Sequence, residues 1–370
     1  MAVTTQLELQ RIIDRRLSGG RLTFDETMAL LKSPDLMTIG RAADEVRRQL
    51  HPDNKVSFII DRNINYTNVC VAQCSFCAFK RDVGHEEGYT LSQEVIDQKL
   101  DELVAIGGTQ VLLQGGLNPA LKLGYYQEMI SHIQTKYPQV TVHGFSPSEL
   151  FYLAKISRLP VLDCLRELQK AGLRSTPGAG GEIFDDAVRK EIGKGKVLSD
   201  QWFEVMEAAQ QLGMNTTATV MYGHIETMEQ RALTLQKLRD SGDKHGGYRA
   251  FIAWDFQPDN TPLGEYMTAH ADQFHLGTGW EYLHFMAVAR LVLDNVPNMQ
   301  VSWVTQGPQI GQLGLHFGAN DFGGTMMEEN VVSAAGTTYR VGPEETIDFI
   351  KAAGFTPYQR DTFYNELKVY

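Results

Sequence analysis

Short apolar and β-branched runs alternate with longer amphipathic stretches along most of the chain. Eight of these runs have the length and composition of buried strands: residues 56–61, 110–114, 141–145, 172–176, 216–222, 249–254, 300–304 and 316–322. The stretches between them carry helix start and stop signals, which predict helices at about 93–106, 200–212, 228–240 and 343–353. Strands separated by helices predict parallel pairing with right-handed crossovers.

Eight such units predict an α/β fold of the (β/α)8 TIM-like barrel type. An open, doubly wound sheet fits the same alternation, but polar and glycine-rich sequence follows almost every expected strand. That favours a barrel, whose site is built from the loops at the carboxyl ends of the strands. Residues 1–50 predict an N-terminal helical extension with two helices, one capped by Thr23 and Glu26 and one at about 37–50. Residues 51–370 are expected to form the barrel, with C-terminal strands and helices.

The composition is that of a globular protein with ample material for a core. Of the 370 residues, 43% are hydrophobic and 21% charged, and the formal net charge is −11. This acidic balance predicts no broad surface for nucleic acid or acidic membranes. No apolar run approaches the roughly 18 residues of a membrane span. The first residues also lack the apolar segment of a signal peptide. We therefore expect a cytoplasmic protein with neither a nucleic-acid nor a membrane partner.

Three of the four cysteines lie close together, directly after the first expected strand. Cys70, Cys74 and Cys77 have the spacing C-x3-C-x2-C, which indicates metal or redox chemistry rather than a disulfide framework. Three thiolates on one loop suit three corners of a [4Fe–4S] cluster and leave the fourth iron open to chelation by S-adenosylmethionine (SAM). The alternative is a zinc site with His85 as the fourth ligand. Cys164 stands alone on an amphipathic stretch and is expected to be a buried apolar residue.

An aromatic residue, Phe76, stands between the last two cysteines. With this residue and its position after the first barrel strand, the motif resembles the radical SAM superfamily, of which C-x3-C-x2-C is the signature. The resemblance implies that the three cysteines ligate a [4Fe–4S] cluster. It also implies that Phe76 lies beside the cofactors and that SAM is cleaved to a 5′-deoxyadenosyl radical.

Two further loops are similar to loops of this family. Gln114, Gly115 and Gly116 follow the second strand, where the family has a Gly-Gly turn that meets the methionyl amine of SAM. After the fourth strand, the run PGAGGE brings Glu182 toward the ribose hydroxyls, and Arg189 follows within reach of a carboxylate. The alternatives are an ordinary turn for the glycines, a helix N-terminal carboxylate for Glu182 and a surface salt bridge for Arg189.

Two of the ten histidines end expected strands at the face where the site is predicted. They are His143 and His224. His224, in the run MYGHIE, is the better candidate for acid–base chemistry or a substrate hydrogen bond, with Tyr222 beside it. A structural loop histidine is the alternative.

Motifs from residue 65 to residue 336 narrow the resemblance. They resemble the radical enzymes of menaquinone (futalosine-pathway) and deazaflavin biosynthesis, and in chain order they are NYTNVC, CSFCAF, QGG, HGFSPSEL, MYGHIET, FQPDNT, SWVTQG and GANDFGGTMMEENVVSAAG. The run WDFQPDNT is similar to the W-x-F-Q-P-x-N-T of the cyclic dehypoxanthinyl futalosine synthases. Aminofutalosine synthases and the tyrosine-using deazaflavin-precursor synthases differ here. The chain departs from the family in reading GAGGE for GGGAE and in lacking a proline within KEIGKGK. The resemblance places five residues at the substrate: Trp254, Gln257, Asn260, Trp303 and Gln306.

The resemblance implies a radical cyclisation. The 5′-deoxyadenosyl radical would take hydrogen from ribose C4′ of dehypoxanthine futalosine, and the carbon radical would close onto the attached benzoate ring. Loss of a proton and return of an electron would restore the aromatic ring and give cyclic dehypoxanthinyl futalosine. The cofactors would be a [4Fe–4S] cluster and SAM, with an electron donor such as flavodoxin or ferredoxin. The sister activities and a non-catalytic iron–sulfur or zinc protein are the alternatives.

Overall fold

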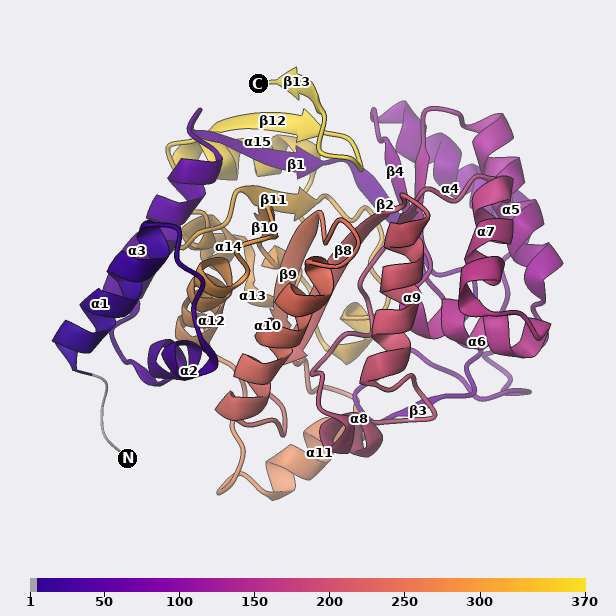
Figure 1. Ribbon diagram of the computed structural model, residues 1–370. Coiled ribbons are helices and arrows are strands. Elements are labelled where there is room, and N and C mark those ends of the chain that lie inside the picture. Colours follow the sequence, from indigo (N-terminus) through magenta and orange to yellow (C-terminus); the bar gives the residue numbers. More distant parts are fainter. Residues whose placement is uncertain (1–4) are drawn as a thin grey trace.

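A curled sheet surrounded by helices forms the centre of the molecule (Figure 1). The structure is a computed structural model that describes residues 5–370. Within this range the sheet has eleven strands: β1 (Lys55–Ile59), β2 (Asp61–Ile64), β4 (Gln110–Leu113), β5 (Thr141–Gly144), β6 (Ser175–Thr176), β8 (Asn215–Tyr222), β9 (Ala250–Asp255), β10 (Asn298–Gln300), β11 (Asp321–Gly324), β12 (Thr356–Arg360) and β13 (Glu366–Val369).

One broken strand brings the two sides of the sheet together into a barrel-like ring. β1 and β2 are consecutive and are separated only by Ile60. β1 pairs in parallel with β11 and β12, whereas β2 pairs in parallel with β4. Between these two ends the strands follow the order β4, β5, β6, β8, β9, β10, β11. A strand is present at each of the eight expected positions, and the predicted fold class is confirmed.

Three of the expected strands have different limits. β10 ends at Gln300, where the expected strand begins, and the residues that follow form the short helix α13 (Trp303–Gln306). β6 is short because Gly172 and Leu173 still close the preceding helix, where the Leu173 N–H donates to the Leu168 carbonyl at 3.0 Å. β11 begins later than expected, at Asp321. The sequence analysis did not foresee β12 and β13, of which β13 pairs antiparallel at the margin of the sheet.

Helices follow the strands and cover the outside of the ring (Figure 1). The four predicted helices are confirmed to within two residues at each end. Capping boxes at Ser146 and Thr227 begin α6 (Pro147–Ser157) and α10 (Met228–Gly242). The helices after β2 are α4 (Gln93–Ala105), α5 (Leu123–Lys136), α6 (Pro147–Ser157), α7 (Val161–Ala171), α8 (Asp186–Ile192), α9 (Ser199–Gln211), α10 (Met228–Gly242), α11 (Pro262–Ala269), α12 (Gly279–Val292), α13 (Trp303–Gln306), α14 (Pro308–Gly314), the 3-10 helix η1 (Ser333–Ala335) and α15 (Pro343–Ala352).

Three helices precede β1, where the sequence predicted two. They are α1 (Gln6–Leu17), α2 (Phe24–Lys32) and α3 (Leu36–Leu50). α3 packs on α12 and α2 packs on α10 (Figure 1). Buried arginines join these layers: Arg16 Nε donates to the Leu291 carbonyl and Arg239 Nη1 to the Leu22 carbonyl, each at 2.8 Å. The N-terminal helices are therefore anchored to the outer side of the helical layer.

A second, two-stranded sheet joins segments that are far apart in sequence. β3 (Gln73–Cys74) pairs antiparallel with β7 (Gly193–Lys194). Ser75 N also donates to the Ile192 carbonyl at 2.8 Å. This sheet fixes the cysteine loop to the end of α8.

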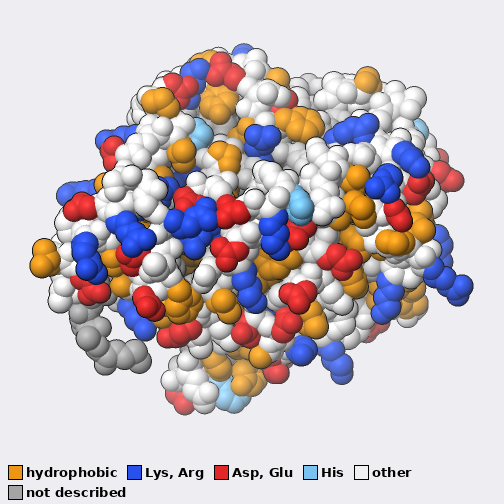
Figure 2. Space-filling model, in the orientation of Figure 1, with side chains coloured by type: hydrophobic (Ala, Val, Ile, Leu, Met, Phe, Trp, Pro, Cys, Tyr) orange, Lys and Arg blue, Asp and Glu red, His pale blue; other side chains and the backbone are white. Residues whose placement is uncertain are grey.

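The outer surface mixes charges of both signs. Lysine and arginine side chains are interspersed with aspartate and glutamate over the face shown in Figure 2. Within residues 5–370, no helix is both long enough and apolar enough to cross a bilayer.

Candidate active site

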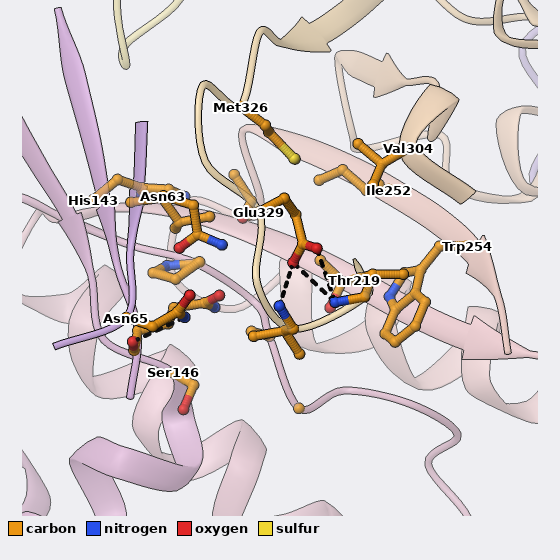
Figure 3. A pocket seen from close by; sticks show the side chains of 18 of the residues that line it. Asn63, Asn65, His143, Ser146, Thr219, Ile252, Trp254, Val304, Met326 and Glu329 are labelled. Atoms are coloured by element: carbon orange, nitrogen blue, oxygen red, sulfur yellow. Dashed lines mark hydrogen bonds between the residues drawn. The ribbon is translucent and has the colours of Figure 1, made fainter. Parts of the chain in front are cut away.

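A cavity of about 370 Å³ lies inside the ring and extends to the carboxyl ends of the parallel strands. In a barrel this is the end at which the loops build a site. Alternate residues of each strand face the ring, as the two-residue period of a strand requires. Figure 3 shows Asn63, Asn65 and His143 on one side of the cavity and Ile252 and Trp254 on the other.

The cysteine loop directs three half-buried thiols into this cavity. Its backbone is held by hydrogen bonds from Cys70 N to the Arg81 carbonyl (2.9 Å) and from Arg81 N to the Asn68 carbonyl (2.8 Å). Burial raises the pKa of the Cys70 thiol, and it raises the pKa of Cys74 to about 12 against the opposing charge of Lys196. Because the thiolate is the metal ligand, metal binding here has to displace protons.

The zinc alternative lacks its proposed fourth ligand. His85 is exposed and outside the cavity lining, and its Nδ1 accepts from Glu87 N at 3.1 Å. Across the described part of the chain, no three His, Cys, Asp or Glu residues are grouped to hold a single metal ion. Cys164 is buried on α7 with 1% exposure, as expected of an apolar core residue.

The turn after β4 is packed tightly against the cysteine loop. A Cβ on Gly116 would lie 2.2 Å from the Val69 carbonyl oxygen and 2.8 Å from the Cβ of Cys70. A Cβ on Gly115 would lie 2.7 Å from the ring of Tyr66. Side chains do not fit at either position without displacing their neighbours, so glycine is required here by close approach. Gln114 and both glycines line the cavity.

The loop after β6 brings a carboxylate to the same cavity. Glu182 is 3% exposed and has a left-handed φ of 41°, a conformation that a non-glycine residue adopts only under constraint. Its Oε1 accepts from Lys196 Nζ, which also lies 4.8 Å from the centre of the Phe76 ring. Glu182 Oε2 and the nearby Ser148 Oγ are buried without a hydrogen-bond partner among the described residues. Two unpaired polar atoms at a cavity wall suit the hydroxyl groups of a ligand.

Arg189 does not reach the cavity, contrary to the prediction. Its guanidinium is buried beneath the Glu182 loop and donates to the carbonyls of Gly180 (3.0 Å) and Val197 (2.8 Å), and also to that of Gly181. Because these carbonyls take up its donors, Arg189 shapes the loop and is not free to bind a ligand carboxylate.

Two indoles also line the cavity. Trp254, on β9, and Trp303, at the start of α13, both line the cavity. The Trp303 Nε1 donates to the Gly324 carbonyl at 3.1 Å, which fixes the plane of the ring. Rings fixed in this way can cover an aromatic ligand.

The three predicted amide side chains do not line the cavity. Gln306 Nε2 donates to Asp255 Oδ1, and Gln257 Nε2 donates to the Asp255 carbonyl at 3.3 Å. Asn260 is exposed and donates to the Ala334 carbonyl at 3.0 Å. Their hydrogen bonds hold the loops behind the indole wall together.

Tyr222 and His224, the predicted catalytic pair, are also placed outside the cavity. Tyr222 is fully buried with its ring centre 4.7 Å from that of Phe285 on α12. His224 is buried with its Nδ1 3.0 Å from a carboxylate oxygen of Glu226. Thr217 and Thr219 of β8 face the cavity, so Tyr222 lies on the opposite, helix-facing side of that strand.

Comparison with known proteins agrees with this arrangement. Residues 64–238 match the Radical SAM superfamily, and residues 245–369 match the CofH/MqnC C-terminal region. A cyclic dehypoxanthine futalosine synthase of Halalkalibacterium halodurans is 43% identical over 364 residues, which cover 98% of this chain and 96% of that protein. The chain belongs to the radical SAM superfamily.

Other radical SAM relatives cover the chain equally well. A protein of the same name from Streptomyces coelicolor is 41% identical over 100% of this chain and 91% of its own. A 5-amino-6-(D-ribitylamino)uracil–L-tyrosine 4-hydroxyphenyl transferase of Methanopyrus kandleri is 39% identical over 99% of this chain and 98% of its own. The crystal structure of methylornithine synthase superposes with a TM-score of 0.73 at 19% identity, covering 94% of this chain and 97% of that one, and shows the same fold.

As a radical SAM enzyme, the protein uses a [4Fe–4S] cluster and SAM. The residues present fit both groups. Three thiols from one loop face the cavity, the glycine turn beside them lines it, and Glu182 Oε2 and Ser148 Oγ are unpaired at its wall.

Several cavity residues escaped the sequence analysis. Glu149 and Ser148 belong to the run HGFSPSEL, in which S-x-x-E marks a helix start and conceals any further role. Lys196 lies in the run GKGK, which looks like a solvated helix end. Glu329 precedes VVSAAG, and in Figure 3 its carboxylate lies in the middle of the cavity, where it accepts from the backbone N–H groups of Val331 and Val332 at 2.9 Å.

Proposed function

We propose that the enzyme converts dehypoxanthine futalosine into cyclic dehypoxanthinyl futalosine. The observation that points to an aromatic substrate is the pair of indoles, Trp254 and Trp303, in the cavity that the cysteine loop also lines. Both belong to the region shared with the CofH/MqnC family. The names of the two relatives at 43% and 41% identity support the same substrate.

In this proposal one half of the cavity holds the cofactors. Cys70, Cys74 and Cys77 ligate the cluster, the turn of Gly115 and Gly116 receives the methionyl end of SAM, and Glu182 with Ser148 accepts its ribose. When bound, the two cofactors supply a 5′-deoxyadenosyl radical that removes a hydrogen atom from the substrate. A donor such as flavodoxin or ferredoxin supplies the electron. We also propose a cytoplasmic location, because thiols are kept reduced there.

The other half of the cavity holds the substrate. The indoles cover its aromatic ring, and the neutral side chains of Asn63, Asn65 and Thr219 offer hydrogen bonds to sugar hydroxyls. Apolar side chains such as Ile252, Val304 and Met326 exclude water from this part of the cavity (Figure 3).

Glu329 is our proposed acceptor for the proton that the aromatic ring loses on cyclisation. Burial raises the pKa of its carboxyl, while hydrogen bonds from the backbone N–H groups of Val332, Ser333 and Val331 oppose that shift. A raised pKa makes a carboxylate a stronger base. Of the other carboxylates that line the cavity, Glu182 is paired with Lys196, Glu149 accepts four hydrogen bonds, and Asp61 accepts from Met326 N and Gln110 Nε2.

A second candidate follows from the archaeal relatives. The Methanopyrus kandleri protein named as a tyrosine 4-hydroxyphenyl transferase is nearly as similar and covers the whole chain. Tyrosine also carries an aromatic ring that two indoles can cover, so the same wall serves this reaction.

Product analysis separates the two candidates. The protein is reconstituted without oxygen, reduced and given SAM with either dehypoxanthine futalosine or tyrosine plus 5-amino-6-(D-ribitylamino)uracil. From the first substrate we expect a cyclised product with two hydrogen atoms fewer than the substrate. From the second pair of substrates we expect no product. If only the mixture of tyrosine and 5-amino-6-(D-ribitylamino)uracil gave a product, the second candidate would replace the proposal. The variant Cys74→Ala, which lacks a cluster ligand, gives the background for both reactions.

A further inference from the structure

Glu149 is a buried carboxylate whose four hydrogen bonds come from neutral donors. It lies in the first turn of α6 and is 3% exposed. Its Oε1 accepts from Gly115 N at 2.9 Å and from Tyr66 Oη at 2.6 Å. Its Oε2 accepts from Ser146 N at 2.8 Å and from Ser146 Oγ at 2.5 Å. The Ser146 bonds complete a helix cap, but the two bonds to Oε1 serve other segments of the chain.

The bond to Gly115 fixes one peptide plane of the glycine turn. The carbonyl of that peptide, at Gln114, accepts from Asn65 Nδ2 at 3.2 Å, so the plane is held from both sides. The next N–H, at Gly116, donates to the Thr67 carbonyl at 2.9 Å. Since the N–H and C=O of a trans peptide point in opposite directions, the Gly115 carbonyl is directed away from Thr67.

The turn and the cysteine loop are in direct contact. Leu117 N donates to Cys70 Sγ at 3.2 Å, and Val71 N donates to the Leu117 carbonyl at 3.1 Å. Gly116 approaches Cys70 so closely that a Cβ would lie 2.8 Å from the cysteine Cβ. The orientation of the turn is therefore set directly beside a cluster ligand.

We propose that Glu149 is a positioning residue that orients the Gly115–Gly116 turn to bind the methionyl end of SAM. The inference rests on the proposed role of this turn. Four donors converge on two oxygens, and this arrangement favours an ionised carboxylate, because protonation makes the hydroxyl of Tyr66 or Ser146 turn from donor to acceptor. An amide places its nitrogen opposite the backbone N–H of Gly115 or Ser146 and leaves that N–H without an acceptor.

The ionisation of Glu149 then makes SAM binding depend on pH. Burial raises the pKa of Glu149 to about 7, and the bonds from Ser146, Tyr66 and Gly115 oppose that shift. The titratable groups that face it are the phenols of Tyr66, after β2, and Tyr126, on α5; burial raises the pKa of both phenols, so they stay neutral. As the pH falls through about 7, the turn loses its carboxylate and the affinity for SAM decreases.

The test is the equilibrium binding of SAM to reconstituted enzyme between about pH 6 and about pH 8.5, compared between wild type and Glu149→Gln. The α-amino group of SAM titrates near pH 8 in both proteins, so the difference between the profiles is the informative quantity. We expect Glu149→Gln to keep its iron and to bind SAM about tenfold more weakly at pH 8. We also expect it to lose the acid limb of the profile, which is the fall in SAM affinity as the pH drops through about 7. Wild-type affinity with an unchanged profile would overturn the inference.

Two phenol variants keep the test sharp even if Glu149→Gln does not fold. Tyr66→Phe removes one donor from the carboxylate and leaves Gly115 in place, so the acid limb moves to higher pH because the charged form has lost a hydrogen bond. Tyr126→Phe removes the neighbouring phenol, whose oxygen is 3.4 Å from that of Tyr66, and leaves all four donors. It serves as the control with an unchanged limb. Equal profiles for both variants would also overturn the inference.

A glycine variant separates this inference from the role of the turn. Gly116→Ala should abolish SAM binding, whatever Glu149 does, because its Cβ collides with the Val69 carbonyl. If Gly116→Ala bound SAM normally, the turn would not be the site and both ideas would fall. If only the Glu149 and Tyr66 variants behaved as wild type, the turn would keep its role and Glu149 would lose its own.

Discussion

The three thiols of the cysteine loop give the most direct prediction at the residue scale. Replacing Cys70, Cys74 or Cys77 by alanine removes one of the three protein ligands, and each variant should lose the iron–sulfur chromophore and all SAM cleavage. Cys164→Ala should retain both, because that thiol is buried on α7 away from the cavity. Iron content, the visible spectrum and 5′-deoxyadenosine release measure the effect. A colourless Cys164→Ala protein would contradict the assignment.

Adjacent glutamates allow a matched test of the proposed proton acceptor. Glu329→Gln keeps the shape of a side chain that lines the cavity but removes its basicity. We expect it to retain cluster and SAM cleavage and to lose most of the cyclised product. Glu328→Gln makes the same change one residue away, where the carboxylate pairs with Arg62 and Lys99 outside the cavity. Equal product yields from the two variants would remove Glu329 from the mechanism.

Individual residues differ in how far the sequence could assign them. The three cluster ligands could be found because all of them lie in one short loop, where their spacing is visible in the sequence. Glu149 and Lys196 reach the same cavity from α6 and from the segment after β7, and only the fold brings them beside Gly115 and Glu182. Such long-range contacts leave no local pattern, so chemistry carried by them had to wait for the structure.

At the scale of elements, the parallel strands could be predicted. The residues of each strand that face the cavity follow from the two-residue period, but this period was applied only in part. The eight strands were expected because each is a short apolar run between helix signals. The strand period also contains the correction for Tyr222, since Thr217 and Thr219 face the cavity and residue 222 is out of phase with them. The two-residue strands β3 and β7 and the marginal strand β13 are too short or too polar to produce a period.

The break between β1 and β2 buries an ionisable group, Asp61. Its titration leads to a prediction about the stability of the fold. Asp61 begins β2, and its Oδ1 accepts from Met326 N at 3.0 Å. Burial raises the pKa of Asp61 to about 6, above the value of about 3.9 expected in the unfolded chain. The folded state therefore keeps the proton on Asp61 up to a higher pH than the unfolded state does. The contribution of this group is most favourable below about pH 4 and is lost as the pH rises to about 6.

Asp61→Asn should remove this loss. The amide oxygen can still accept from Met326 N, the Gln110 amide that donates to Asp61 Oδ2 at 3.2 Å has to turn its oxygen toward the new amide nitrogen, and no charge has to be buried. Relative to wild type, we expect little change in stability near pH 4 and a gain of about 1–3 kcal/mol at neutral pH. Thermal unfolding at a series of pH values measures the difference. A difference that stays constant with pH would mean that Asp61 has an ordinary pKa in the folded protein.

On the scale of the whole molecule, two sequence regions each supply one wall of a single cavity. The cysteine loop, the glycine turn and Glu182 belong to residues 64–238, which match the Radical SAM superfamily. Trp254, Trp303 and other residues of the opposite wall belong to residues 245–369, which match the CofH/MqnC C-terminal region. In the proposed mechanism the first region holds the cofactors and adds polar contacts from Asn65 and Thr219, whereas the second region supplies the indoles that cover the substrate ring.

This division predicts the outcome of exchanging the C-terminal region. A chimera would carry residues 1–244 of this chain and the region of the Methanopyrus kandleri relative that corresponds to 245–369, which is feasible because the two proteins align over 99% of this chain. The cofactor wall is unchanged, so iron content and SAM affinity should stay at wild-type values. The substrate wall is replaced, so the cyclised product should disappear and a product from tyrosine should form. The reverse chimera should show the opposite change. A chimera that binds SAM normally and still cyclises dehypoxanthine futalosine would place substrate choice in residues 64–238 instead.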